Sequence, residues 1–199
     1  MEEPVQSDEM CRGVHGGIKK EVAMIEKFSA YQIRRIRMED LAQAAEVERR
    51  CFPEAEAAST EDLKFRIETF PESFLVAEAE GKIIGFINGC VTNERVICDE
   101  MFSDASYHNP DGAYQAIFGL DVIPEFCSRG IASDLMGHLI EDAKKRGRKG
   151  LILTCKKRLI PYYEAFGYRN MGISDSVHGG AVWYDMILEF PISDTSREG

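Results

Sequence analysis

Apolar residues recur along this chain with two different periods, and each change of period marks a predicted element. Where they recur every three or four residues, the pattern predicts an amphipathic helix, and where they alternate or form short runs, it predicts a strand. Clusters of glycine, proline and polar residues separate the elements and predict turns. The predicted strands are residues 31–37, 74–80, 82–91, 114–122, 150–155, 168–173 and 181–189, and the predicted helices are residues 38–50, 60–69, 130–146 and 159–166.

The rest of the chain is organised around a central segment that runs from residue 114 to residue 146. A buried strand, 114–122, leads through a short turn into an amphipathic helix that begins near Gly130. Pro124 cannot donate a hydrogen bond to a sheet, so we expect the strand to end near it. The small residues at 127–132 let the backbone approach a ligand, and the first amides of a helix have no partner within it. The turn therefore predicts an anion site suited to a phosphate or pyrophosphate, although an ordinary strand-to-helix turn has the same pattern.

Length and composition describe one globular domain with two tails. The chain has 199 residues, and its 44% of hydrophobic and 29% of charged residues are ordinary for a soluble protein with a full core. We expect the domain to span residues 30–191, with tails at 1–29 and 192–199, and a short helix can form at 18–29. No apolar run reaches the length of a membrane span, and the acidic start of the chain is not a secretory signal. The sequence therefore predicts no membrane partner.

Charge and cysteine content narrow the partners further. The formal net charge of −10 argues against nucleic acid as a partner. It weakly favours a cationic substrate such as an amine, although an acidic surface also serves solubility alone. The six cysteines contain no C-x-x-C pair, and most lie in or beside predicted strands. This pattern indicates reduced, mostly buried thiols in a cytoplasmic protein, and no metal site.

Two motifs carry a resemblance to a known family. Residues 129–132, Arg-Gly-Ile-Ala, match the second half of the motif Gln/Arg-x-x-Gly-x-Gly/Ala, while Cys127 stands where that motif has Gln or Arg. Residues 161–168 resemble a short-helix motif, aromatic-Tyr-Glu-x-x-Gly-Phe/Tyr. Both motifs, and the order of the predicted elements over residues 31–190, resemble the GNAT superfamily of N-acetyltransferases. The resemblance implies an α/β fold, the GNAT acyl-CoA N-acyltransferase fold, with a mixed, mostly antiparallel sheet of about seven strands, helices on both faces and splayed central strands.

Within the superfamily, the chain looks most similar to the serotonin (arylalkylamine) N-acetyltransferase-like group. The local likenesses are Cys-Phe-Pro at 51–53, Pro-Asp-Gly at 110–112 and Pro-Tyr-Tyr-Glu at 161–164. The resemblance implies direct transfer of the acetyl group of acetyl-CoA to a primary amine of a small molecule, arylalkylamine- or polyamine-like. It also favours a homodimer, because dimers are common among such enzymes.

The resemblance implies that acetyl-CoA is the cosubstrate and that no metal takes part. The central strand would splay from residues 150–155, so that Leu120 and Val122 can pair with the pantetheine amides as an added strand does. A backbone amide near Leu120 would polarise the thioester carbonyl, as an oxyanion hole does. The residues that the resemblance assigns to acetyl-CoA are Leu120, Asp121, Val122, Ser128, Arg129, Gly130, Ile131, Ala132 and Ser133.

Tyr163 is the candidate catalytic residue. In the family motif its phenol can protonate the departing thiolate of coenzyme A as a general acid. The position of Tyr163 in the sequence, taken alone, is also explained by a tyrosine that packs against the sheet and whose hydroxyl bonds to any nearby polar group. Tyr162 lies beside it in the predicted helix but faces elsewhere, which is typical of a packing residue.

The resemblance does not supply a general base. The serotonin enzymes carry two histidines on the central strand, at positions that here hold Ala116 and Phe118. Glu54 and Glu56 lie in the loop that usually borders the amine pocket, where they could bind an ammonium group or relay a proton. His178 lies in another loop that could border the same pocket. Each of these three candidates for substrate binding is also explained as an ordinary surface side chain.

Two other functions fit the same residues. One is a protein acetyltransferase that acts on an N-terminus or a lysine, with the long polar stretch 92–111 contacting the peptide. The other is a non-catalytic acyl-CoA-binding module, which the missing base allows and the Tyr163 motif argues against.

Overall fold

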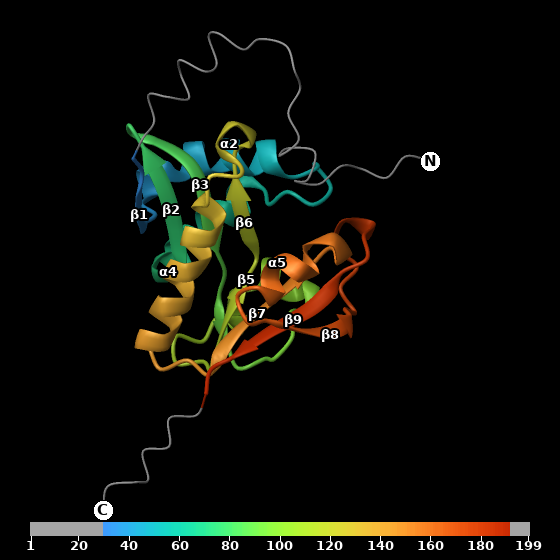
Figure 1. Cartoon of the computed structure of the whole chain (residues 1–199). Helices are drawn as coiled ribbons and strands as arrows, with labels where there is room; N and C mark the ends of the chain where they lie inside the picture. The colour runs from blue at the N-terminus through green and yellow to red at the C-terminus, as the bar shows by residue number, and fades with distance from the viewer. Residues whose placement is uncertain (1–29, 192–199) are drawn as a thin grey trace, which may run out of the picture. The chain divides into compact units, whose positions relative to one another are not determined.

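The structure, a computed structural model, describes residues 30–191 (Figure 1). The predicted tails, 1–29 and 192–199, and the predicted helix at 18–29 lie outside the described residues. The described chain forms two compact units. The first unit holds the residues up to Asn88 together with Gly119–Gly137, and the second holds Gly89–Phe118 together with the residues from His138 onward.

The helices and strands follow the predicted order. The strands are β1 (Gln32–Arg35), β2 (Phe74–Ala79), β3 (Lys82–Asn88), β4 (Val91–Thr92), β5 (Tyr114–Ile117), β6 (Gly119–Val122), β7 (Gly150–Cys155), β8 (Arg169–Ile173) and β9 (Tyr184–Glu189). The α-helices are α2 (Leu41–Cys51), α3 (Thr60–Thr69), α4 (Ile131–Lys145) and α5 (Ile160–Glu164). Short 3-10 helices are η1 (Met38–Asp40), η2 (Pro71–Ser73), η3 (Asp99–Phe102), η4 (Ala105–Tyr107), η5 (Pro124–Phe126), η6 (Lys157–Leu159) and η7 (His178–Gly180).

In the first unit, strands β1, β2, β3 and β6 form one antiparallel sheet in that order. Helices α2 and α3 pack on it with their apolar stripes. Helix α3 starts with a capping box: the Ser59 hydroxyl accepts the backbone N–H of Asp62, and the Asp62 carboxylate accepts the backbone N–H of Ser59. The buried core between sheet and helices contains Ile36, Ala44, Val47, Cys51, Leu63, Ile67, Phe74, Val76, Ile83 and Phe86.

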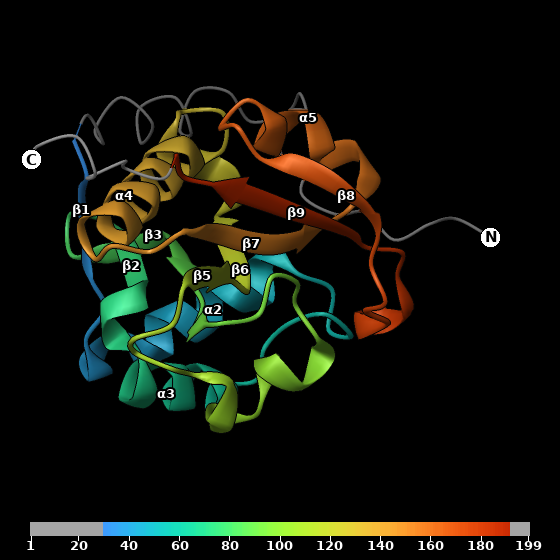
Figure 2. The same cartoon turned by 90° about the horizontal axis from the view of Figure 1, so that it is seen from below.

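The first half of α4 belongs to the same unit and covers the other face of its sheet. Figure 2 shows α4 above these strands and α2 and α3 below them. Ile131, Leu135 and Met136 of α4 are buried. The hydroxyl of Tyr31 donates a hydrogen bond to the carboxylate of Asp134, and burial together with this bond raises the pKa of Tyr31 to about 12. The bond ties the chain before β1 to the first turn of α4.

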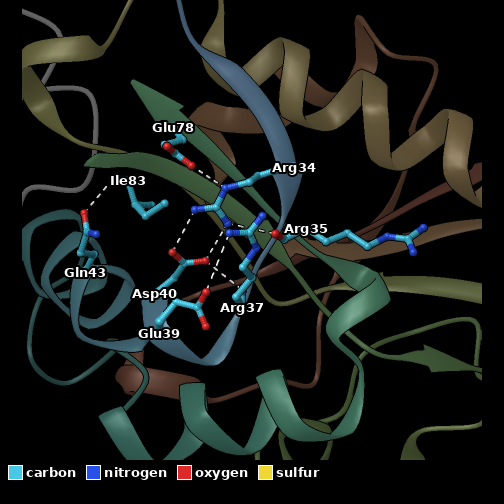
Figure 3. Close-up of polar contacts among 8 residues, drawn as sticks. All are labelled: Arg34, Arg35, Arg37, Glu39, Asp40, Gln43, Glu78 and Ile83. Atoms are coloured by element: carbon cyan, nitrogen blue, oxygen red, sulfur yellow. Dashed lines mark hydrogen bonds and ion pairs between the residues drawn. The ribbon is translucent and has the colours of Figure 1, made fainter. Parts of the chain in front are cut away.

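An ion-pair network joins β1 to the start of α2 (Figure 3). Arg34 donates two hydrogen bonds to the carboxylate of Asp40, at 2.6 and 2.9 Å, and a third to Glu78. The same carboxylate accepts the backbone N–H of Arg37 at 2.8 Å. The guanidinium of Arg34 lowers the pKa of Asp40, as expected for a bidentate, charge-assisted pair. The network fixes the direction in which the chain enters α2.

In the second unit, strands β4, β5, β7, β9 and β8 form a sheet in that order. Strands β5 and β7 are parallel, and each other pair is antiparallel. Helix α5 packs on β8 and β9. The backbones of β7 and β9 approach closely at Gly150, where a Cβ atom would stand 2.0 Å from the carbonyl oxygen of Leu188. Only glycine fits this position.

The predicted fold class is confirmed, but the strands differ from the prediction at several points. The segment predicted as one strand, 82–91, ends as β3 at Asn88, and Val91 already belongs to β4 in the other sheet. The segment predicted as one strand, 114–122, is two strands, β5 and β6, which separate at Phe118 and belong to different sheets. The described residues therefore hold nine strands in two sheets rather than one sheet of about seven. Strand β9 starts at Tyr184 instead of residue 181, because a 3-10 helix with left-handed glycines precedes it. The long polar stretch 92–111 contains the short 3-10 helices η3 and η4.

Candidate active site

The turn that precedes α4 has the backbone of an anion site. Ser128 and Gly130 both have positive φ, +60° and +84°. Residues in alternating right- and left-handed conformations turn successive N–H groups toward one point, and the first N–H groups of a helix add to them. Nothing lies within 4 Å of the position where a Cβ on Gly130 would stand, so the face of the turn is open. Glycine is needed here for its backbone conformation rather than for lack of space.

The side chains of the turn support the same use. The guanidinium of Arg129 lies over the ring of Phe126, 5.0 Å from its centroid, and is half-buried. Ile131 is buried and anchors the helix start, while Ala132 and Ser133 are half-buried beside it. The six predicted residues are thus continuous: 128–130 form the turn, and 131–133 begin the 15-residue helix at its positive end. This arrangement fits a diphosphate group.

Strand β6 has one edge that no strand covers. Within residues 30–191, its only hydrogen-bonded neighbour strand is β3, with Leu120 opposite Ile87 and Val122 opposite Gly85. Leu120 is half-buried, and Asp121 and Val122 are buried. No strand of the described residues occupies the other edge of β6, so its backbone groups can pair with amides of a ligand, although the carbonyl of Val122 also accepts the thiols of Cys51 and Cys127.

Tyr163 lies inside a cluster of aromatic rings in the second unit. Its ring centroid is 5.2 Å from that of Tyr162 and 5.9 Å from that of Tyr168, both in edge-to-face geometry, and its side chain is buried. Burial raises the pKa of Tyr168 well above its usual value. Gly167, with φ +91°, ends the helical segment, and the backbone N–H of Tyr168 returns to the carbonyl of Tyr163. The motif therefore holds the Tyr163 ring in a fixed position.

His178 belongs to a second aromatic group in the same unit. Its ring centroid lies 4.9 Å from Phe102, which in turn lies 5.0 Å from Phe118. The indole N–H of Trp183 donates to the carbonyl of His178 at 2.8 Å, and the Lys156 ammonium lies 4.3 Å from the Trp183 ring centroid. The sequence prediction placed His178 in a loop that could border the amine pocket, and Phe118 where the serotonin enzymes carry a histidine. The structure links the two residues through Phe102.

The two glutamates predicted to border the amine pocket differ in the structure. The side chain of Glu54 is exposed, whereas that of Glu56 is buried. Both stand in the loop between α2 and α3, where the backbone N–H of Glu56 donates to the carbonyl of Pro53 at 2.9 Å. Burial of Glu56 is inconsistent with an ordinary solvated carboxylate at that position.

The sequence reasoning missed a set of buried polar side chains in the first unit. Glu48 on α2 and Arg66 on α3 are buried, and so is Asn88 at the end of β3. A signal was present for two of them. Glu48 follows Ala44 at helical spacing within the apolar stripe of α2, and Arg66 stands between Leu63 and Ile67 in the stripe of α3. A charged residue in an apolar stripe indicates a buried partner.

The cysteines of the described residues are free, and their environments predict their reactivity. Cys51 and Cys155 are buried, and burial raises the pKa of both thiols, that of Cys155 to about 12. Because the thiolate is the nucleophile, we expect iodoacetamide to modify both on the order of 100-fold more slowly than the half-buried Cys98 and Cys127. Peptide mapping after timed alkylation of the native protein measures these rates, and equal rates at all four positions would contradict the structure.

The chain matches the Acetyltransferase (GNAT) family over residues 41–168. This match spans the turn before α4, strand β6 and the Tyr163 helix. The chain belongs to this family. As a GNAT enzyme it is an acetyl-CoA-dependent acetyltransferase, which confirms the family, the enzyme class and the cosubstrate predicted from the two motifs.

Curated relatives and solved structures agree with this membership. The chain is 30% identical over 122 residues to "Probable hydrolase YhcX" of Bacillus subtilis (strain 168), a match that covers 57% of this chain and only 22% of that longer protein. It is 23% identical over 147 residues to "Serotonin N-acetyltransferase" of Mesocricetus auratus, covering 72% of this chain and 70% of that protein. The likeness to that enzyme agrees with the predicted subgroup.

Two solved structures show the same fold at low sequence identity. The loading GNATL domain of CurA from Lyngbya majuscula has a TM-score of 0.70 at 15% identity, with 81% of this chain and 98% of that chain covered. The ribosomal-protein-S18-alanine N-acetyltransferase from Escherichia coli has a TM-score of 0.62 at 19% identity, with 85% and 100% covered. Among the described residues of this GNAT chain, no helix is long and apolar enough to cross a bilayer, and no three metal-ligating side chains gather.

Proposed function

We propose that this GNAT enzyme acetylates the primary amine of a small molecule, arylalkylamine- or polyamine-like. The observation that carries the proposal is the match to serotonin N-acetyltransferase, which spans 72% of the chain. That enzyme acts, by its name, on an arylalkylamine. The aromatic group of Phe102, Phe118 and His178 supports an acceptor with a ring, because aromatic rings pack on one another in offset or edge geometry.

The turn before α4 and the free edge of β6 hold acetyl-CoA in this proposal. The backbone of residues 128–133 binds the diphosphate, and the backbone of Leu120 and Val122 pairs with the pantetheine amides. Asp121 contributes its backbone between them. Acetyl-CoA supplies an activated acetyl group as a thioester. A backbone amide near Leu120 polarises the thioester carbonyl, and no metal takes part.

The remaining residues act on the acceptor and on the leaving group. Tyr163 gives the proton of its phenol to the coenzyme A thiolate as a general acid. His178 and Glu56 bind the acceptor, the first through its ring and the second through its charge. Glu54, which is exposed, attracts the ammonium form of the amine to the same loop. Residues 30–191 act as one acetyltransferase domain in the cytoplasm, and a homodimer is the expected assembly.

A panel of acceptors tests the proposal. The purified chain is incubated with acetyl-CoA and, in separate reactions, an arylalkylamine, a polyamine, a peptide with a free N-terminus and a peptide with a free lysine. Acetylated products are measured by mass spectrometry. We expect product with the small amines. Product with the peptides alone would assign the chain to protein acetylation, and tight acetyl-CoA binding without any product would indicate a binding module.

A further inference from the structure

Four polar side chains from four elements are buried together in the first unit. They come from α2, α3, β3 and β6, and each is at least nine-tenths shielded from solvent. Their exposed fractions are 4% for Glu48, 5% for Arg66, 0% for Asn88 and 2% for Asp121. Burying two carboxylates with one guanidinium is costly unless a proton or a ligand compensates the extra negative charge.

The contacts within the cluster show where the charge lies. One oxygen of Glu48 accepts the backbone N–H of Ala58 at 2.7 Å, and Glu48 also shares a hydrogen bond with Asp121. A hydrogen bond between two carboxyl groups needs one proton, so the ionised pair takes up a proton more readily than a single carboxylate does. Nη1 of Arg66 donates to Oδ1 of Asn88 at 3.2 Å, which fixes the orientation of the amide and turns its NH₂ group away from the guanidinium.

The electrostatic surroundings raise the proton affinity of the doubly ionised pair, which is the form that accepts a proton. Burial raises the pKa of Asp121 well above its usual value, and the charge and hydrogen bond of Glu48 add to the rise, while Arg66 opposes it. The neighbouring ionisable groups on α2 are Cys51, whose own pKa is raised by burial and by Asp121, and Arg50, which opposes that rise. Cys127, after β6, donates to the carbonyl of Val122, as Cys51 does.

A second, independent observation indicates a ligand at this cluster. Nδ2 of Asn88 has no hydrogen-bond partner among the described residues, although the side chain is fully buried. It borders Gly119, 3.3 Å from the point where a Cβ on that residue would stand. Oδ2 of Asp121 lies 3.2 Å from the same point. Within the described chain, an unpaired donor and an unpaired acceptor that border the same glycine in a buried site suit a bridging water, and their closeness to Gly119 leaves little room for a side chain there.

We infer that the Glu48–Asp121 pair is the proton acceptor for the amine, reached through one water held between Asn88 and Asp121 at Gly119. The inference rests on the proposed function. It supplies the base that Ala116 and Phe118 cannot supply. Gly119 directly precedes Leu120, whose amide polarises the thioester, so the pair lies beside the reacting carbonyl. The enzymes that the chain resembles carry histidines earlier on the central strand, at the positions of Ala116 and Phe118.

The proton balance of the step is complete. The lone pair of the amine nitrogen forms the C–N bond to the acetyl carbon, and the C–S bond breaks with its electrons on sulfur. The nitrogen gives one proton to the water, and the water gives one to Oδ2 of Asp121. The thiolate takes its proton from Tyr163. A carboxyl group with a raised pKa is a stronger proton acceptor than an ordinary aspartate, which suits work near neutral pH.

The pH dependence of kcat tests the inference, with both substrates saturating so that kcat reports groups in the enzyme–substrate complex. We expect Asp121→Asn to lower kcat about 100-fold at mildly acidic pH, and the deficit to close as the pH approaches the pKa of the free amine. We expect Glu48→Gln to move the acidic limb to lower pH, because it removes a charge that raises the pKa of Asp121. The affinity for acetyl-CoA should change less than about twofold in both variants.

Asp40→Asn is the matched control, since it removes another buried carboxylate of the first unit that pairs with Arg34 instead. Asp40→Asn should lower Tm but leave the acidic limb of the kcat–pH profile at the same pH as in the wild type. Asp121 differs from Asp40, because its pKa in the folded state is raised rather than lowered. A group with a raised folded-state pKa contributes stability at low pH, and this contribution is lost as the pH rises through that pKa. Asp121→Asn should therefore gain in Tm relative to the wild type as the pH rises.

The outcomes separate this inference from the proposed function. Two results would overturn the inference and leave the proposed function standing. In the first, the wild type turns over and Asp121→Asn has the same acidic limb. In the second, Asp121→Asn loses the same fraction of kcat at all pH values. If Asp121→Asn does not fold, an unmoved limb in Glu48→Gln overturns it equally. A wild type that acetylates none of the acceptors overturns both.

Discussion

Replacing Tyr163 with Phe is expected to lower turnover by about 100- to 10,000-fold, the range that general acid–base groups contribute. The substitution keeps the ring that packs against Tyr162 and Tyr168 and removes only the hydroxyl. If that hydroxyl protonates the departing thiolate, its loss affects the transition state and not the binding of acetyl-CoA. Steady-state kcat, together with a calorimetric Kd for acetyl-CoA, measures the two effects separately.

Tyr162→Phe is the matched control for this prediction, because it removes a hydroxyl from the adjacent residue of the same helix. We expect its turnover to stay within about threefold of the wild type, since the half-buried Tyr162 acts as a packing residue. Similar losses in the two variants would assign both hydroxyls to packing. Equal losses of turnover and of acetyl-CoA affinity in Tyr163→Phe would contradict the acid role.

Gly130→Asp is expected to weaken acetyl-CoA binding by about 100-fold, or about 2.7 kcal/mol. Asp tolerates the left-handed backbone at φ +84° better than most residues, and no atom lies within 4 Å of its Cβ position. The substitution therefore acts mainly by placing a negative charge at the turn proposed to bind a diphosphate. Isothermal titration of acetyl-CoA measures the loss, which should shrink at high ionic strength because salt screens exposed charges.

Gly147→Asp repeats the same change at the other end of α4. Gly147 also has a left-handed backbone, φ +71°, and nothing lies within 4 Å of its Cβ position. We expect its Kd for acetyl-CoA to stay within about twofold of the wild type, because the helix presents no anion site at its C-terminus. An equal loss of affinity in both variants would place the diphosphate elsewhere.

The turn before α4 could be predicted from sequence because its signal is local. A glycine between a strand and an amphipathic helix specifies both the left-handed backbone and the exposed helix amides, and Gly130 has both. The capping box of α3 is local in the same way, since Ser59 and Asp62 satisfy each other's backbone groups. The helix start, the turn and their order along the chain follow from such short-range patterns.

The division of the central strand could not be predicted, because hydrogen-bond partners decide it. Apolar positions continue from Ile117 and Phe118 past a single glycine to Leu120, so the pattern describes one strand. In the structure, β5 pairs with β7 and β6 pairs with β3, and Phe118 belongs to neither ladder. Such pairings join residues far apart in the sequence, which a period cannot encode.

The buried polar cluster was missed because pairing converts unfavourable positions into stable ones. The resemblance assigned Asp121 to acetyl-CoA, and the positions of Glu48 and Arg66 in apolar stripes indicate buried partners without saying which residues these are. Asp121 and Glu48 depend for their burial on each other and on Arg66, which lies on a third element. Glu56 is similar, since nothing in the loop sequence distinguishes it from the exposed Glu54. Polar groups of this kind are recognised only once tertiary partners are known.

The most direct test of the central claim uses acetyl-CoA with a ¹³C-labelled acetyl group and an arylalkylamine. Free thiol and labelled amide are measured in the same reaction over time. Acetyl transfer by this GNAT enzyme predicts equal amounts of both products and a rate proportional to enzyme concentration. Saturable binding of acetyl-CoA, with thiol release no faster than in buffer for any amine or peptide, would contradict catalysis and leave a binding module.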